Sequence, residues 1–139
     1  MPAGESFWQR LATRSQSNLY FALVFLSADR REAFRDVYRF LRAADDVADS
    51  GGAPDDVRRA LGAWRRELDL VYAGRATHPI ALRLAEAVRR YALGRAHFET
   101  ILDALEADVE PRRFADLPAL EAWCEAMSST LGYLCLEIL

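Results

Sequence analysis

Three aspartates close an expected helix in the segment AADDVADSGG, residues 43–52. Because the last turn of a helix carries partial negative charge, each carboxylate there costs about 0.3–1 kcal/mol. Residues four apart lie on one side of a helix, so Asp45 and Asp49 share a face, while Asp46 is rotated by roughly 100° toward solvent. Two carboxylates placed in this way repel each other, and a bound cation is the simplest means of neutralising them.

The helix that carries these aspartates has an apolar stripe that leads to them. When residues 30–49 are projected on a helix, Asp45 falls within the stripe one turn beyond Leu41, and Arg42 falls at its edge. We therefore expect Asp45 and Asp49 to face one cavity with Arg42 at its rim, and at least one of the two carboxyls to have a raised pKa. The stripe consists of Phe34, Val37, Tyr38, Leu41 and Ala48, with Ala44 at its margin.

The side chains in this segment indicate Mg²⁺ rather than a transition metal, because no His or Cys is near and carboxylate oxygens are hard donors. Two carboxylates do not complete the coordination of Mg²⁺, which usually takes further ligands from substrate phosphates. An aspartate pair that opens into an apolar interior therefore suggests a diphosphate attached to an apolar tail. The alternative is a solvated helix end whose charges pair with Arg39 and Arg42.

Composition and length indicate one globular domain, and the start of the chain, its apolar runs and its two cysteines indicate the cytoplasm. The chain has 139 residues, of which 52% are hydrophobic and 28% charged, so it holds enough apolar material for a core. Its net charge of -3 argues against nucleic acid as a partner. The start does not resemble a secretory signal, and the longest apolar run, residues 19–26, is far shorter than the ~20 residues of a membrane span. Cys124 and Cys135 lie about three turns apart on one expected helix, too far for a disulfide, and are expected to be buried.

Every segment is expected to be helical, because none shows the alternation of a strand. Proline at a helix start and glycine just past a helix end mark most of the boundaries. The connections are short, which predicts a single all-α domain. The expected helices cover residues 7–13, 18–26, 29–50, 54–73, 79–93, 95–107 and 116–139.

The last expected helix ends in the apolar run LGYLCLEIL, residues 131–139. An exposed apolar surface of this size needs a partner. We therefore expect residues 1–139 to be the N-terminal part of a longer domain, incomplete on its C-terminal side, and to self-associate through this helix. The residues expected to be exposed are Leu131, Tyr133, Leu134, Leu136 or Ile138.

Three segments resemble the squalene/phytoene synthase family in order and spacing. They are SQSNLYFALVFL, RREAFRDVYRFLRAADDVAD and LPALEAWCEAMSSTLG, which begin at residues 15, 30 and 117. The resemblance implies an all-α helical bundle of the isoprenoid synthase type. It also implies an enzyme that joins two prenyl diphosphates head to head through a cyclopropyl intermediate. Farnesyl diphosphate would give presqualene diphosphate or squalene, and geranylgeranyl diphosphate would give phytoene, as in hopanoid or carotenoid biosynthesis.

The same resemblance implies roles for individual residues. Asp45 and Asp49 would hold Mg²⁺ against a substrate diphosphate, and Arg42 would contact the phosphate oxygens. Tyr38 would line the reaction cavity, and Trp123, at the place of a family tyrosine, would present an aromatic surface there. The residues expected to bind substrate are Ser15, Ser17 and Tyr20, together with Arg42.

Besides Trp123, the chain departs from the family pattern in three further places. Gln16 stands between two serines where the family commonly has a basic residue. Met127, Ser128 and Ser129 replace the family's Val-Ala-Gly run. The family's second aspartate-rich helix has no counterpart within residues 1–139, so we expect the chain alone to be inactive.

Two other classes of function stay open at this point. A head-to-tail prenyl transferase or a terpene cyclase also carries DDxxD, although the Arg-Arg-Gly that often follows the motif in chain-elongating enzymes is missing. A non-catalytic helical scaffold or assembly factor would account for Trp123 and for the absent second motif. We expect a prenyl diphosphate as the substrate and no nucleic acid as a partner, and the cytoplasmic chain could also contact a membrane peripherally.

Overall fold

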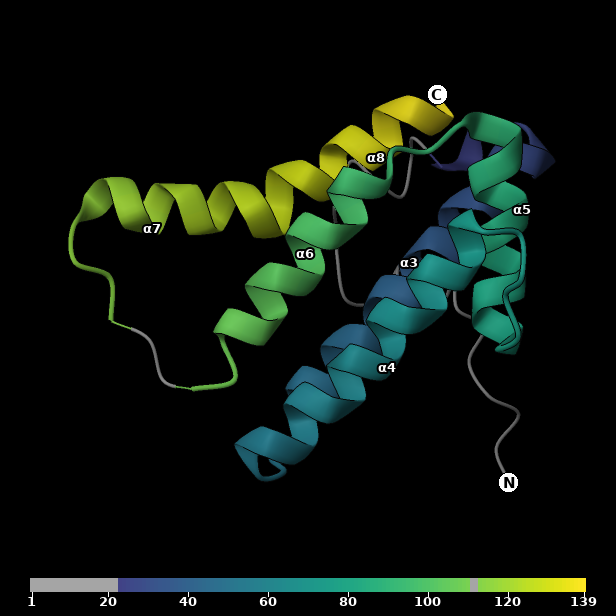
Figure 1. Ribbon diagram of the computed structural model, residues 1–139. Helices are drawn as coiled ribbons and strands as arrows, with labels where there is room; N and C mark the ends of the chain where they lie inside the picture. The colour runs from purple at the N-terminus through teal and green to yellow at the C-terminus, as the bar shows by residue number, and fades with distance from the viewer. Residues whose placement is uncertain (1–22, 111–112) are drawn as a thin grey trace, which may run out of the picture. The chain divides into compact units, whose positions relative to one another are not determined.

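The computed structural model describes residues 23–110 and 113–139 (Figure 1). The chain separates into two compact units, residues 1–32 and 33–139. In the first unit the described residues are 23–32, where the Arg31 guanidinium donates a hydrogen bond to the Leu26 carbonyl oxygen at 2.8 Å. The expected helix over residues 7–13 lies outside the described residues. The second unit contains the candidate site.

All regular structure in the described ranges is helical, as the sequence predicted, and no strand occurs there. No helix among these residues is both long enough and apolar enough to cross a bilayer. The elements are α3 (Ala28–Ala48), α4 (Pro54–Tyr72), α5 (Pro79–Tyr91), α6 (Arg95–Ala107), α7 (Leu117–Cys124), the π-helical turn η1 (Glu125–Ser129) and α8 (Thr130–Ile138).

Local sequence signals set most helix ends. Gly51 and Gly74 adopt left-handed φ angles of 72° and 71° just beyond α3 and α4, a conformation that glycine reaches without strain. At the start of α7, the Asp116 side chain accepts a hydrogen bond from the Ala119 backbone N–H at 2.9 Å. Ala92 was not foreseen as a terminator: it takes a left-handed φ of 52° and ends α5 two residues before the expected limit.

Phe40 of α3 is the centre of the core of the second unit. Its ring is fully buried and meets Trp64 of α4 and Phe98 of α6 edge to face, with centroids 5.3 Å and 6.0 Å away. Such aromatic pairs contribute about 0.5–1.5 kcal/mol each beyond the area that they bury. They tie α3 to two helices that follow it in the sequence.

The buried face of α3 differs from the projected stripe. Tyr38, assigned to the stripe, is 39% exposed, and Phe40, which was left out of it, is fully buried. The helix is therefore rotated from the expected orientation, and the aspartates lie at the flank of the buried face. The buried residues of α3 are Ala33, Asp36, Val37, Phe40, Leu41 and Ala44.

The segment predicted as one final helix is a continuous helical run with a π turn inside it. η1 adds one residue to a turn between α7 and α8, and the Ser128 hydroxyl donates to the Cys124 carbonyl oxygen at 2.7 Å. Figure 1 shows α8 lying alongside α6, and both η1 and α8 pack against α6. Cys124 is exposed rather than buried as expected, while burial raises the pKa of the half-buried Cys135 thiol.

The C-terminal end of α8 is tied to the start of α6. Glu137 accepts a hydrogen bond from the Gly94 backbone N–H at 2.9 Å, and its other oxygen lies 3.3 Å from His97 Nε2. Leu134 and Ile138 are consequently buried, which corrects the expectation that they would be exposed. Of the remaining residues in that expectation, Leu131 is half-buried, whereas Tyr133 and Leu136 are exposed.

We expect Glu137→Ala to lower the free energy of unfolding by about 1–2 kcal/mol, because the variant loses a charge-assisted hydrogen bond and a carboxylate at the N-terminus of α6. Urea denaturation measures the change. Glu121→Ala, at an exposed position of α7, removes an equal charge and should change stability by less than about 0.5 kcal/mol. Equal effects of the two substitutions would show that the contact of Glu137 with α6 does not stabilise the fold.

Candidate functional site

Arg42 lies between two of the three aspartates of α3. Its Nε is 3.0 Å from an oxygen of Asp46, and its Nη1 is 3.5 Å from an oxygen of Asp45. The side chain of Arg42 is half exposed, so each of these ion pairs is worth little stability in water. The arrangement is nonetheless well defined: one guanidinium serves as the counter-ion of two neighbouring carboxylates.

A cavity of about 200 Å³ opens beside this ion pair. Three residues of α3 form its polar side, namely Tyr38, Arg42 and Asp45. The other side is apolar and comes from three further elements, α6, η1 and α8. The apolar lining residues are Ile101, Leu105, Met127 and Leu131, with Leu41 of α3. The cavity therefore has a charged end and an apolar end, both built within residues 33–139.

Burial raises the pKa of the Asp45 carboxyl, and the negative charge of Asp49 raises it further. Asp46 adds a smaller increase, and the positive charge of Arg42 opposes the shift. The expectation of a raised pKa within the aspartate pair is thus confirmed. Asp49 itself is exposed and does not line the cavity, so the structure brings Asp45 to the concave surface and leaves Asp49 at its margin.

The donor set at this end of α3 fits Mg²⁺ as a partial site. All the side-chain donors are carboxylate oxygens, which Mg²⁺ prefers, and a cation would relieve the repulsion between Asp45 and Asp49. Within the described ranges, no group of three or more His, Cys, Asp or Glu side chains is arranged to hold a metal. A cation here therefore needs ligands from outside these residues, and phosphate oxygens are suitable ones.

The structure does not bring Trp123 to this cavity. Its indole N–H donates to both oxygens of Asp108, at 3.1 Å and 3.0 Å, and its ring lies against Phe114 with centroids 5.8 Å apart. Asp108 follows the last residue of α6, so this contact holds α7 against the end of that helix. Ser15, Ser17 and Tyr20 lie outside the described residues.

The apolar end of the cavity was missed in the sequence. Ile101 and Leu105 are four residues apart on α6, as are Met127 and Leu131 across the π turn, and this spacing places each pair on one face. Helical spacing alone could have indicated the first pair. The spacing of the second pair is equally visible, but the face that it turns toward α6 could not be assigned, because a π turn shifts the phase of the residues that follow it.

Comparisons with known proteins show that most of this chain is similar to squalene and phytoene synthases. The family model described as squalene/phytoene synthase matches residues 12–139. A presqualene diphosphate synthase of Rhodopseudomonas palustris is 34% identical over 123 residues, which are 88% of this chain and 44% of that protein. A presqualene diphosphate synthase of Zymomonas mobilis is 32% identical over 120 residues, 85% and 41% of the two chains. A phytoene synthase of Mycobacterium tuberculosis is 31% identical over 121 residues, 87% and 39%.

The chain thus spans less than half the length of these relatives. Its all-α structure agrees with the isoprenoid synthase fold expected for such proteins.

We expect Asp45→Asn to raise the free energy of unfolding at pH 7. A carboxyl with a raised pKa binds its proton more tightly in the folded state, so its ionisation destabilises the fold. The gain should therefore be full at neutral pH and fade as the pH falls toward the ordinary value of 3.8, below which both states are protonated. Urea denaturation across this pH range measures it.

Asp46→Asn serves as the matched control for that series. It removes the same charge from the neighbouring position, where the side chain is 60% exposed, and should produce a smaller change. If Asp45→Asn destabilised the protein at pH 7, the attraction of Arg42 would outweigh burial and the repulsion from Asp49.

Proposed function

Because this chain belongs to the squalene/phytoene synthase family, we propose that it builds one wall of a site that joins two prenyl diphosphates head to head. One observation carries the proposal: the cavity beside Asp45 has Arg42 at its charged end and Ile101, Met127 and Leu131 at its apolar end. A prenyl diphosphate has the same two ends. The names of the relatives favour presqualene diphosphate or phytoene as the product. By the family resemblance, the substrate would be farnesyl diphosphate in the first case, with squalene as a further product, and geranylgeranyl diphosphate in the second.

Each residue at the charged end has a proposed role. Asp45 and Asp49 would hold Mg²⁺, and Arg42 would bind phosphate oxygens, for which a planar guanidinium is well suited. Mg²⁺ bound there would supply positive charge that stabilises a departing diphosphate. The half-exposed ring of Tyr38 stands at the edge of the cavity, where an aromatic face can stabilise a cation on the substrate.

The position of Arg42 implies that the cation and the diphosphate bind together. In the unliganded protein the guanidinium neutralises Asp45 and Asp46. If Arg42 turned to a phosphate, Asp45 would lose its counter-ion and its affinity for Mg²⁺ would rise. By linkage, a bound Mg²⁺ would release Arg42 and raise the affinity for diphosphate by the same factor.

We expect inorganic pyrophosphate to increase the affinity for Mg²⁺ at least about five-fold in titration calorimetry, which is the lower end of typical coupling. Arg42→Gln should reduce this factor toward one, and Asp45→Asn with Asp49→Asn should abolish binding of the Mg²⁺–pyrophosphate pair.

The double variant Asp55→Asn with Asp56→Asn is the control for that titration. It removes two exposed carboxylates from the first turn of α4 and should leave the coupling unchanged. Wild-type affinity in the Asp45/Asp49 double variant would contradict the proposed metal site.

We further propose that residues 1–139 form the N-terminal part of a longer prenyl synthase domain, and that the second aspartate-rich wall comes from elsewhere. The shorter span relative to the relatives supports this proposal, as do apolar side chains exposed along α7 and α8. These side chains are Leu117, Leu120, Tyr133 and Leu136.

The 139-residue chain, incubated with farnesyl diphosphate and Mg²⁺, is expected to release no pyrophosphate and to self-associate in light scattering. Leu136→Gln should weaken the association, because Leu136 is 67% exposed and burying a leucine contributes about 1.5–3 kcal/mol. Leu82→Gln, at a half-exposed position on α5, should have no such effect. Pyrophosphate release by this chain alone would instead favour a terpene cyclase or another complete enzyme.

A further inference from the structure

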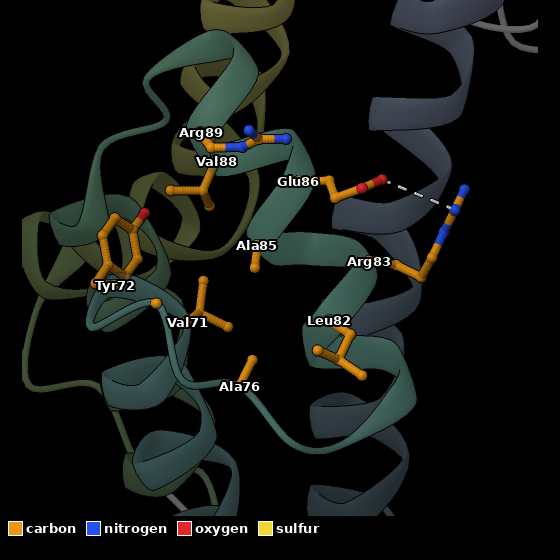
Figure 2. Close-up of a pocket in the computed structure, with 10 residues that line it drawn as sticks. Val71, Tyr72, Ala76, Leu82, Arg83, Ala85, Glu86, Val88 and Arg89 are labelled. Carbon is orange, nitrogen blue, oxygen red and sulfur yellow. Dashed lines mark ion pairs between the residues drawn. The ribbon is translucent and has the colours of Figure 1, made fainter.

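A second cavity, of about 630 Å³, lies between the end of α4, the turn that follows it and α5 (Figure 2). Its volume is within the 300–1,000 Å³ typical of ligand pockets, and it shares no residue with the cavity beside Asp45. The lining is mainly apolar. We call this cavity the α4–α5 groove, and its apolar lining residues are Val71, Tyr72, Ala76, Leu82, Ala85 and Val88.

Two features of the α4–α5 groove distinguish it from an ordinary gap between helices. Leu82 is 50% exposed, although leucine favours burial by about 1.5–3 kcal/mol. The hydroxyl of Tyr72 donates to the Leu93 carbonyl oxygen at 2.8 Å, so this polar atom is satisfied within the protein and the ring faces the groove. The groove therefore presents apolar surface to its surroundings.

Three charged residues line the groove, Arg83, Glu86 and Arg89. Figure 2 shows Arg89 beside Val88 at one end, and Arg83 paired with Glu86. Arg83 also lies 3.6 Å from the buried Asp36, so its charge is neutralised by partners. Neither Arg75, in the turn after α4, nor Arg89 forms an ion pair with another residue in the described parts of the chain.

This positive charge contrasts with the chain as a whole. Residues 72–97 contain five arginines and one glutamate, whereas the complete chain has a net charge of -3. Arg83 and Arg95 pair with carboxylates of Asp36, Asp69 and Glu99, so the positive charge left beside the α4–α5 groove is that of Arg75 and Arg89. Exposed apolar surface beside uncompensated arginines is the combination that binds anionic lipid headgroups and their acyl chains.

We propose that the α4–α5 groove docks this protein on an anionic phospholipid membrane. Acyl-chain carbons fill the groove around Leu82 and Val88, and headgroup phosphates contact Arg75 and Arg89. The acidic balance of the rest of the chain orients the protein, because its other faces are repelled by the same surface. This proposal does not rest on the prenyl synthase reaction, and its test does not use enzyme activity.

Co-sedimentation with phospholipid vesicles tests the docking. The 139-residue protein should bind vesicles of phosphatidylcholine with one quarter phosphatidylglycerol, bind weakly to phosphatidylcholine alone, and dissociate as the salt concentration rises. Arg75→Gln and Arg89→Gln should each lower the partition coefficient about five-fold. Leu82→Gln, which changes no charge, should lower it by a comparable factor if Leu82 enters the lipid.

Arg58→Gln with Arg59→Gln is the control of equal charge, since it removes a half-buried and an exposed arginine from the first turns of α4 and should change binding less than two-fold. Circular dichroism of each variant shows whether the fold is kept. Three outcomes would overturn the proposal: equal losses in the control, unchanged binding by Leu82→Gln, or equal binding to neutral vesicles. Displacement from vesicles by soluble geranyl diphosphate, with loss of this effect in Arg89→Gln, would make the groove a prenyl diphosphate site instead.

Discussion

The packing of Phe40 between Trp64 and Phe98 decides where the chemistry of this chain lies. Because both contacts are edge to face and the ring is fully buried, they fix the rotation of α3 about its axis. Residue 45 lies about 140° around a helix from residue 40, so Asp45 cannot reach the centre of the core. It lies instead at the flank, where α6, η1 and α8 complete a cavity with a charged and an apolar end.

Much of the fold was predictable because its helix ends depend on residues close by in the sequence. α6 begins and ends where its pattern predicted, and the glycines after α3 and α4 have the backbone angles that such positions require. The exceptions depend on contacts from far along the chain. Ala92 adopts a conformation that its residue type disfavours. The end of α8 is held through Glu137 by Gly94 and His97, which precede Glu137 by 43 and 40 residues.

The candidate site was predictable to the same degree. Carboxylates and an arginine at helical spacing are visible in any projection, so the meeting of Asp45, Arg42 and Tyr38 at one surface could be anticipated. The projection did not place Asp49 correctly, because the buried face of α3 is rotated from the projected stripe. With that rotation, Asp49 is exposed and does not line the cavity. Nor could it find Asp108, whose carboxylate holds Trp123 at the end of α6 through a contact between separate elements.

The π turn of η1 gives the last helical run a place that can absorb a change in its length. A π turn holds one residue more than a regular turn, so removal of one residue from 125–129 would restore the regular winding and leave the residues beyond it close to their present faces. Removal of one residue from the start of α8 would instead turn the residues that follow by about 100° relative to α6. Leu134 and Ile138 would then leave their buried positions, and Glu137 could no longer reach Gly94. The run should therefore accept single-residue deletions in η1 during evolution and reject them in α8.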